Sequence, residues 1–178
     1  MERLKHKHIL LDTNILINAA KCKDGFAPFF KILSHNDVQS VIDYGIKLEF
    51  LRTSNTEERR EIKNRYLDLI LGKNRMELFV NSEIIDSAIE IANIYSRKTK
   101  NANKQFSFTD CTIVAQMKKY QSSLYLATLD NNDFPIYLMD RIYTHTIDNK
   151  QEILNVGIYS FSESKYQQCI EEFSQVDK

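Results

Sequence analysis

The chain has 178 residues, of which 43% are hydrophobic, and its 24 basic and 24 acidic residues give a formal net charge of zero. A chain of this size predicts a single domain, here residues 1–178, with its own hydrophobic core. Zero net charge excludes a molecule-wide field that attracts polyanions, so a nucleic-acid site would be a local patch. The three cysteines are widely spaced, which argues against a disulfide framework and is typical of a reducing cytosol. Because no run is long and apolar enough to span a membrane, we expect a cytoplasmic protein.

The hydrophobic pattern predicts strands that alternate with helices along the chain. Strands are expected at residues 9–11, 38–41, 76–80, 124–128 and 156–161. Helices are expected at residues 14–20, 42–52, 55–71, 82–95, 110–120 and about 163–173, with a further helical turn at 28–33. Residues 136–149 fit no single pattern. The alternation is typical of an α/β fold with a mostly parallel sheet.

Capping residues and apolar spacing predict how these helices begin and which faces they bury. Ser82 and Thr109 are the expected caps of two helices, and Asn55 or Thr56 caps a third. The buried face of helix 55–71 is expected to carry Ile62, Tyr66, Leu69 and Ile70. The buried face of helix 82–95 is expected to carry Ile84, Ile85, Ala88, Ile91, Ala92 and Tyr95.

Acidic residues recur where predicted strands end or helices begin. Asp12 ends the first strand, Asp110 opens a helix, Asp130 and Asp133 follow the strand 124–128, and Glu49 lies on a helix whose neighbouring positions are apolar. The carboxyl ends of parallel strands meet at one edge of a sheet, so these acids are expected to lie close together. Clustered carboxylates repel one another unless a divalent cation neutralises them, and Mg²⁺ and Mn²⁺ both take oxygen ligands.

Four segments resemble, in order, the motifs of PIN-domain nucleases, and within that family the VapC-type toxin ribonucleases. The first motif is an apolar strand followed by Asp-Thr-Asn. The second and third motifs each contain one acid, and the fourth contains two. The four segments are Ile9 to Leu16, Ser40 to Ile42 with Glu49, Phe108 to Ala115, and Thr128 to Phe134. Together they span residues 8–134 and leave a strand and a helix, about residues 156–173, beyond the last motif.

The resemblance implies a three-layer α/β/α sandwich with a central, mostly parallel sheet, and a metal-dependent endoribonuclease site. It also implies an RNA substrate, a homodimer and an antitoxin partner that blocks the acidic cleft. One or two Mg²⁺ or Mn²⁺ ions would be held by Asp12, Glu49, Asp110 and Asp130. Thr13, Asn14 and Thr128 would orient these carboxylates or water. Asp133 competes with Asp130 for the fourth ligand position; Asp130 is favoured because it is nearer the strand end.

Simpler interpretations of the acids stay open at this point. Asp12 could be a helix cap, Glu49 could point to solvent, Asp110 could serve the helix dipole, and Asp133 could only shape a turn. For the whole chain, the alternative function is a PIN-like binding or scaffolding module in RNA processing, with little catalysis of its own. A scaffold, however, gives no physical reason to keep mutually repelling carboxylates together.

Other residues suggest further chemistry less strongly. A basic segment with Arg97, Lys98, Lys100 and Lys104 could bind an RNA backbone, although such loops are usually only solvated. A metal-independent ribonuclease would need paired imidazoles, and the spacing of the histidines does not group them. Those histidines are His6, His8, His35 and His145. Cys111 is expected to be a core residue and not a nucleophile.

Overall fold

The central feature of the computed structural model is a single six-stranded sheet. The structure describes residues 4–52, 54–72, 76–98, 106–132, 135–148 and 152–176. Within these residues the strands are β1 (His8–Leu11), β2 (Gln39–Asp43), β3 (Met76–Leu78), β4 (Leu124–Thr128), β5 (Met139–Asp148) and β6 (Ile153–Phe161). Their order is β3-β2-β1-β4-β6-β5. The pairs β3–β2, β2–β1 and β1–β4 are parallel, whereas β6 and β5 are antiparallel additions. The predicted mostly parallel sheet is confirmed.

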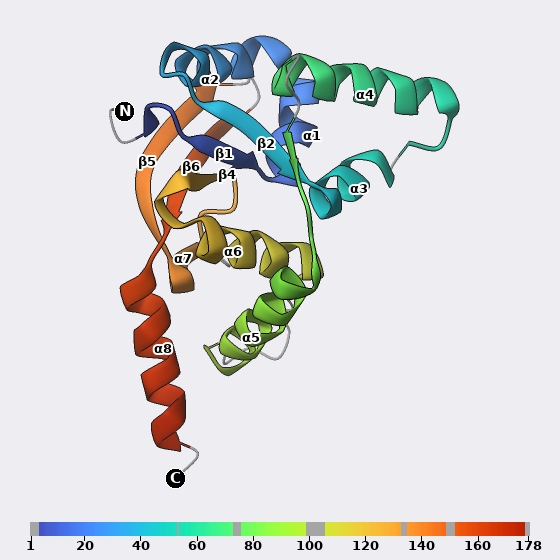
Figure 1. The fold of residues 1–178 in the computed structure, drawn as a ribbon. Helices are drawn as coiled ribbons and strands as arrows, with labels where there is room; N and C mark the ends of the chain where they lie inside the picture. The colour runs from blue at the N-terminus through green and yellow to red at the C-terminus, as the bar shows by residue number, and fades with distance from the viewer. Residues whose placement is uncertain are drawn as a thin grey trace.

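The helices are α1 (Thr13–Lys21), α2 (Lys23–His35), α3 (Tyr44–Arg52), α4 (Glu57–Leu71), α5 (Ser82–Lys98), α6 (Phe108–Tyr120), α7 (Pro135–Leu138) and α8 (Glu163–Val176), and a short 3-10 helix spans Gln121–Ser123. Figure 1 shows α1, α2 and α4 over one face of the sheet and α5 and α6 over the other, which is the predicted three-layer arrangement. Helix α8 follows β6 and extends away from the sheet. No helix in the described part of the chain is long and apolar enough to cross a membrane.

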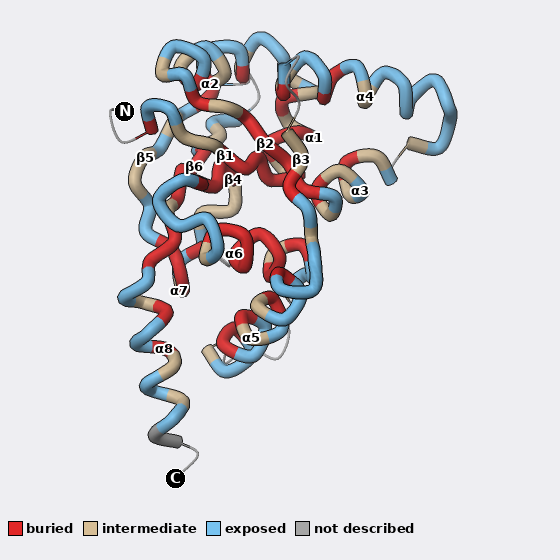
Figure 2. The backbone as a smooth tube through the Cα atoms, viewed as in Figure 1, coloured by how far each residue is buried: buried red, intermediate tan, exposed pale blue. Residues whose placement is uncertain are grey.

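Burial explains why β1 and β4 lie at the centre of the sheet. Ile9, Leu10 and Leu11 are fully buried, and every residue of β4 is buried. Strands covered on both faces have continuous apolar runs, which is what these two segments contain. Figure 2 shows the buried part of the backbone running through the central strands and α6, whereas the outer side of α4 is exposed.

The structure corrects the prediction between residues 21 and 52. A single residue, Cys22, separates α1 from α2, and α2 begins five residues before the predicted helical turn at 28–33 and continues through Pro28. Helix α2 persists because Phe26, Phe29 and Leu33 bury one helical face. Strand β2 also runs two residues further than predicted, so Ile42 is a buried strand residue and not part of the helix.

The predicted faces of two helices were wrong in part. On α4, Ile62 and Leu69 are 57% and 75% exposed, whereas Tyr66, Leu67 and Leu71 are buried. Apolar residues lie on several sides of α4, so spacing alone could not identify the buried one. Helix α5 continues to Lys98, buries Ile94, and turns Ile85 and Ala92 outward. Its cap is Asn81, whose Oδ1 accepts a hydrogen bond from the Ile84 amide, and not Ser82.

The ambiguous region 136–149 forms α7 and then β5, which pairs with β6 over most of its length. Strand β6 begins at Ile153, three residues before the predicted start, and α8 ends at Val176 instead of near residue 173. Helix α4 begins after Thr56, which is one of the two predicted caps. The helix ends before Gly72, whose φ of 73° lies in the left-handed region that glycine tolerates.

Candidate functional site

Asp12 lies directly after β1, where the sequence predicted it, and only 7% of it is exposed. Although it is the N-cap residue of α1, its side chain makes no capping hydrogen bond. Instead, its Oδ2 accepts hydrogen bonds from Asn14 Nδ2 at 2.7 Å and from Thr128 Oγ1 at 2.6 Å. Residues of the first and fourth motifs therefore hold this carboxylate in place. The interpretation of Asp12 as a simple cap is not supported.

Asn14 and Thr128 also connect α1 to the turn after β4. Asn14 Oδ1 accepts a hydrogen bond from the Leu129 amide at 3.0 Å, and Thr128 Oγ1 accepts one from the Asp130 amide at 3.0 Å. The Asp130 carboxylate in turn accepts a hydrogen bond from the Asn132 amide at 3.2 Å. Asn14 and Thr128 thus fix the backbone of the turn that contains Asp130, and they also fix the side chain of Asp12.

Glu49 is held by threonines from the first and third motifs. Its Oε2 accepts a hydrogen bond from Thr13 Oγ1 at 2.7 Å, and its Oε1 accepts one from Thr109 Oγ1 at 2.7 Å. Glu49 is therefore directed toward α1 and α6 and is not an outward-facing helix residue.

The start of α6 differs from the prediction. Ser107, and not Thr109, is the N-cap: its Oγ accepts a hydrogen bond from the Asp110 amide, while Asp110 Oδ2 accepts one from the Ser107 amide at 2.8 Å. This capping box fixes Asp110 at the first turn of α6. Because Ser107 caps the helix, the Thr109 hydroxyl is available to Glu49.

The acids affect one another electrostatically. Burial is the main reason that the pKa of Asp12 is raised to about 6, and the charges of Asp110 and Glu49 raise it further, against the hydrogen bond from Thr128. The pKa of Asp110 is also raised, mainly by burial and then by the charges of Glu49 and Asp130. The four predicted acids therefore lie close enough together to repel, which is typical of functional carboxylate clusters.

The carboxylates of this acidic cluster are nevertheless spaced apart. Within the described residues, no three His, Cys, Asp or Glu side chains converge closely enough to hold a metal ion. The two observations agree, because charges act over several ångströms whereas ligands must lie within about 2.6 Å of an ion. An open set of carboxylates fits Mg²⁺, which keeps several waters and binds through few carboxylates plus substrate phosphate.

Asp43 is an acid that the sequence analysis missed. It ends β2 beside Asp12, is fully buried, and its pKa is raised mainly by burial. Its Oδ1 accepts a hydrogen bond from the Ile46 amide at 2.7 Å, and its Oδ2 accepts one from Gln116 Nε2 at 3.1 Å. Asp12 was identified because it directly follows a predicted strand. Asp43 was missed because the second strand was predicted to end at residue 41, two residues before this acid.

The basic residues suggested for RNA binding are only partly described. Lys100, Lys104 and the acid Asp133 lie outside the described residues. Arg97 and Lys98 belong to the last turn of α5 and not to a loop, and both contact α8. The Arg97 guanidinium lies 4.8 Å from the centre of the Phe173 ring, and Lys98 forms an ion pair with Glu172.

The residues considered for other chemistry have structural surroundings. The His6 ring nitrogen lies 3.7 Å from an Asp37 carboxylate oxygen, and His145 packs against Phe29 with ring centres 5.6 Å apart. Burial and the charge of Asp110 raise the pKa of Cys111 to about 11. Its thiol is therefore protonated at neutral pH and is a poor nucleophile, as expected for a core cysteine.

Comparison with known proteins agrees with the motif pattern. A family model described as PIN domain matches residues 9–137, which is more than half of the chain and includes all four acids. No curated protein matches the chain. Among solved structures, the VapC20 toxin of Mycobacterium tuberculosis, described as cleaving the sarcin–ricin loop, is 16% identical with a TM-score of 0.44, over 62% of this chain and 82% of that one. The chain belongs to the PIN-domain family, whose members are generally nucleases.

Proposed function

We propose that this protein is a divalent-metal-dependent endoribonuclease. The observation that carries the proposal is the environment of Asp12: a nearly buried carboxylate whose pKa is raised further by two other acids, Asp110 and Glu49. Such repulsion destabilises the folded protein unless a cation compensates for it. A divalent ion would compensate for the charges of these carboxylates, and an RNA phosphate would complete the coordination of that ion.

In the proposed reaction Asp12, Glu49, Asp110 and Asp130 would hold one or two Mg²⁺ or Mn²⁺ ions. A bound ion would supply Lewis acidity to water and to the scissile phosphate. Asn14 and Thr128 fix the Asp12 carboxylate, and Thr13 and Thr109 fix that of Glu49. These hydrogen bonds orient the ligands before any ion arrives, and such orientation commonly raises metal affinity 10- to 100-fold.

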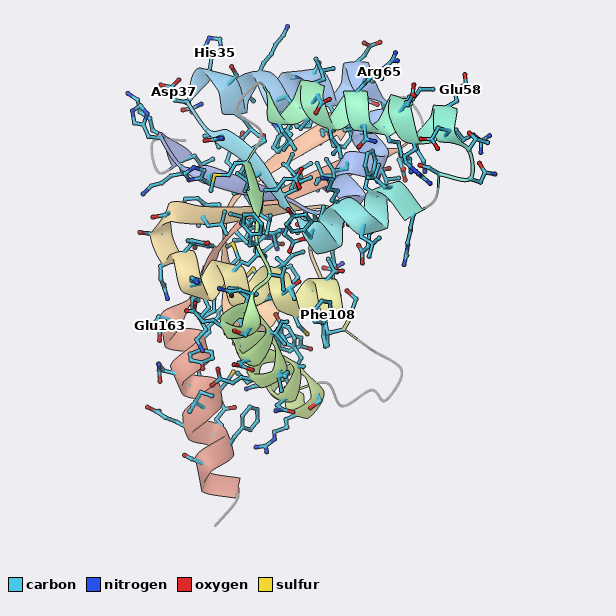
Figure 3. All side chains as sticks on the ribbon, turned by 45° about the vertical axis from the view of Figure 1, so that its right-hand side comes forward. His35, Asp37, Glu58, Arg65, Phe108 and Glu163 are labelled. Atoms are coloured by element: carbon cyan, nitrogen blue, oxygen red, sulfur yellow. The ribbon has the colours of Figure 1, made fainter. Side chains whose placement is uncertain are left out.

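Single-stranded RNA incubated with the purified protein should be cleaved in Mg²⁺ or Mn²⁺ and left intact in excess chelator. Asp12→Asn should lower the rate at least about 100-fold, because a metal supplies several kcal/mol of transition-state stabilisation. The matched control is Asp37→Asn, at the amino end of β2 and far from Phe108 at the start of α6 (Figure 3), which should cleave normally. Undiminished cleavage in chelator would exclude the metal mechanism and favour the histidine alternative.

The scaffold alternative is favoured by one observation, the lack of three converging ligands among the described residues. Asp130→Ala separates the two functions. A metal-dependent nuclease should lose cleavage and keep its melting temperature, whereas a scaffold would show no metal-dependent cleavage to lose. A full rate in Asp130→Ala would instead move the fourth ligand position to Asp133.

The proposal also includes a role as the toxin of a toxin–antitoxin pair, acting as a single-domain cytoplasmic homodimer. It rests on the four motifs that resemble VapC-type toxins. The antitoxin would block the acidic edge; apart from that edge, a protein partner would find apolar surface at the amino end of β2, in a cleft of about 600 Å³ lined by Phe30, Leu33, Val38, Tyr66, Leu69 and Leu71 among others. Expression of the wild type should arrest bacterial growth and Asp12→Asn should relieve the arrest; equal growth of both strains would contradict the toxin role.

A further inference from the structure

We propose that Tyr44 and Phe79 form a stacking platform for an unpaired nucleobase of the RNA. This inference rests on the proposed function and adds to it the class of substrate: RNA with a single-stranded base next to the cleavage point. Tyr44 is 47% and Phe79 is 71% exposed, although both are large aromatic residues. Every nucleobase has a flat π face, so exposed aromatic rings beside a phosphate site bind single strands with little sequence preference.

The two rings are held together before any ligand binds. Their centres lie 5.5 Å apart and their planes are tilted by 50°. Lys47 Nζ lies 5.7 Å from the centre of the Tyr44 ring and donates hydrogen bonds of 2.9 Å to both carboxylate oxygens of Glu77. The ion pair therefore joins α3 to β3 next to the Tyr44 ring. With this tilt, one base can stack on one ring while the other ring contacts its edge.

The platform lies on the same edge of the sheet as the acids. Tyr44 directly follows β2 and Phe79 directly follows β3, just as Asp12 directly follows β1. These three strands are parallel neighbours in the order β3-β2-β1. Since neighbouring strands are about 4.8 Å apart, the backbones of Tyr44 and Phe79 lie roughly 5 and 10 Å to one side of Asp12. Tyr44 also shares helix α3 with Glu49, so the platform and the acids are joined by one rigid element.

The size of the platform favours a base over a protein. A fully buried aromatic side chain contributes roughly 150–250 Å², so the exposed parts of these two rings offer about 250 Å² in total. A specific protein interface needs about 800 Å² from each partner. The Lys47–Glu77 ion pair borders the two rings. Leu48, 68% exposed and one helical turn after Tyr44, extends the apolar surface along α3, but the three side chains together still offer less area than a protein interface needs. A single nucleobase, in contrast, matches the area of one or two rings.

The test measures binding of a single-stranded oligoribonucleotide that contains 2-aminopurine, whose fluorescence falls when it stacks, with all proteins carrying Asp12→Asn to prevent cleavage. Phe79→Ala and Tyr44→Ala should each weaken binding about 10-fold and restore part of the fluorescence. Phe79→Trp should bind as well as Phe79 or better. Tyr120→Ala is the matched control, because Tyr120 is a part-exposed aromatic at the other end of α6, roughly 18 Å from Phe108.

The outcomes separate this inference from the proposed function. If wild-type protein cleaves RNA but Phe79→Ala binds and quenches as the control does, the platform is refuted and the nuclease stands. If Phe79→Ala instead changes the sedimentation of the protein while RNA affinity is unchanged, the rings contact a second protein chain and the platform is likewise refuted. If the wild type neither binds nor cleaves any RNA, both proposals are overturned.

Discussion

Asp12 directly follows β1 and Asp43 is the last residue of the neighbouring parallel strand β2. Both are buried acids with raised pKa values, yet their surroundings differ. The Asp43 carboxylate is matched by groups of the fold: the Ile46 amide at the start of α3 and the Gln116 side chain of α6. The Asp12 carboxylate receives hydrogen bonds on Oδ2, and after burial the charges of Asp110 and Glu49 raise its pKa, whereas the charge of Glu49 also raises the pKa of Asp43. Burial and a raised pKa are therefore common to both acids, and the hydrogen-bond partners of the two carboxylates distinguish them.

This difference assigns the two acids different roles. Asp43 caps α3 and joins it to α6, so its contribution is to the stability of the fold. Asp12 is held in place by side chains of α1 and β4 without a positive partner among them, which suits the metal-ligand role that we propose for it. A measurement in which Asp43 behaves as a ligand, or Asp12 as a cap, would contradict these roles.

The largest expected effect on stability is the pH dependence of Asp12. Its pKa is 3.8 in the unfolded chain and about 6 in the folded protein, so between these values the folded state binds more protons than the unfolded state. The free energy of unfolding therefore decreases as pH rises from about 4 to 7, by as much as about 3 kcal/mol from this group. The measurement is urea unfolding of wild type and Asp12→Asn in chelator across this range.

The difference between the two proteins isolates Asp12 from the other titrating groups. Asp12→Asn should become the more stable protein as pH rises, with the gap widening toward pH 7. Saturating Mn²⁺ at pH 7 should stabilise the wild type and leave Asp12→Asn almost unchanged. Parallel curves for the two proteins, or a variant that unfolds in chelator, would show that Asp12 is a structural cap.

Asp43→Ala should destabilise the protein by about 2 kcal/mol and leave the cleavage rate of the folded fraction intact. The change removes the cap of α3 and leaves the Gln116 amide without its acceptor in the core. Asp43→Asn is the matched variant and should cost less. Its new amide can donate to Gln116 Oε1, which is buried and has no hydrogen-bond partner in the described part of the chain. Lost cleavage at unchanged stability in Asp43→Ala would place Asp43 in the metal site.

Local sequence was enough to predict four acids and three residues that hold them: Thr13 contacts Glu49, and Asn14 and Thr128 contact Asp12. Asp12 and Asp130 could be identified because an apolar strand ending at a polar turn is visible within ten residues. The second partner of Glu49 could not be predicted, since Thr109 lies 60 positions away, and the segment from Ser107 to Asp110 offers two possible caps. Asp43 was missed because the end of β2 was placed two residues early. Exposed Ile62 and Leu69 show that apolar spacing on α4 did not determine which face is buried.

Helix α6 supplies a donor to each of two acids on or beside α3: Gln116 to Asp43 and Thr109 to Glu49. If Glu49 is a ligand, removing only the Thr109 hydroxyl should loosen it without unfolding the protein. We expect Thr109→Val, which keeps the side-chain shape, to weaken Mn²⁺ binding about 10-fold in titration calorimetry, whereas Thr109→Ser should bind nearly as well as wild type. Both variants should melt within a few degrees of the wild type. If Val and Ser weaken binding equally, the hydroxyl has no part in holding Glu49. If weaker binding simply follows a lower melting temperature, Thr109 supports the fold as Gln116 does, and the contrast between the two acids disappears.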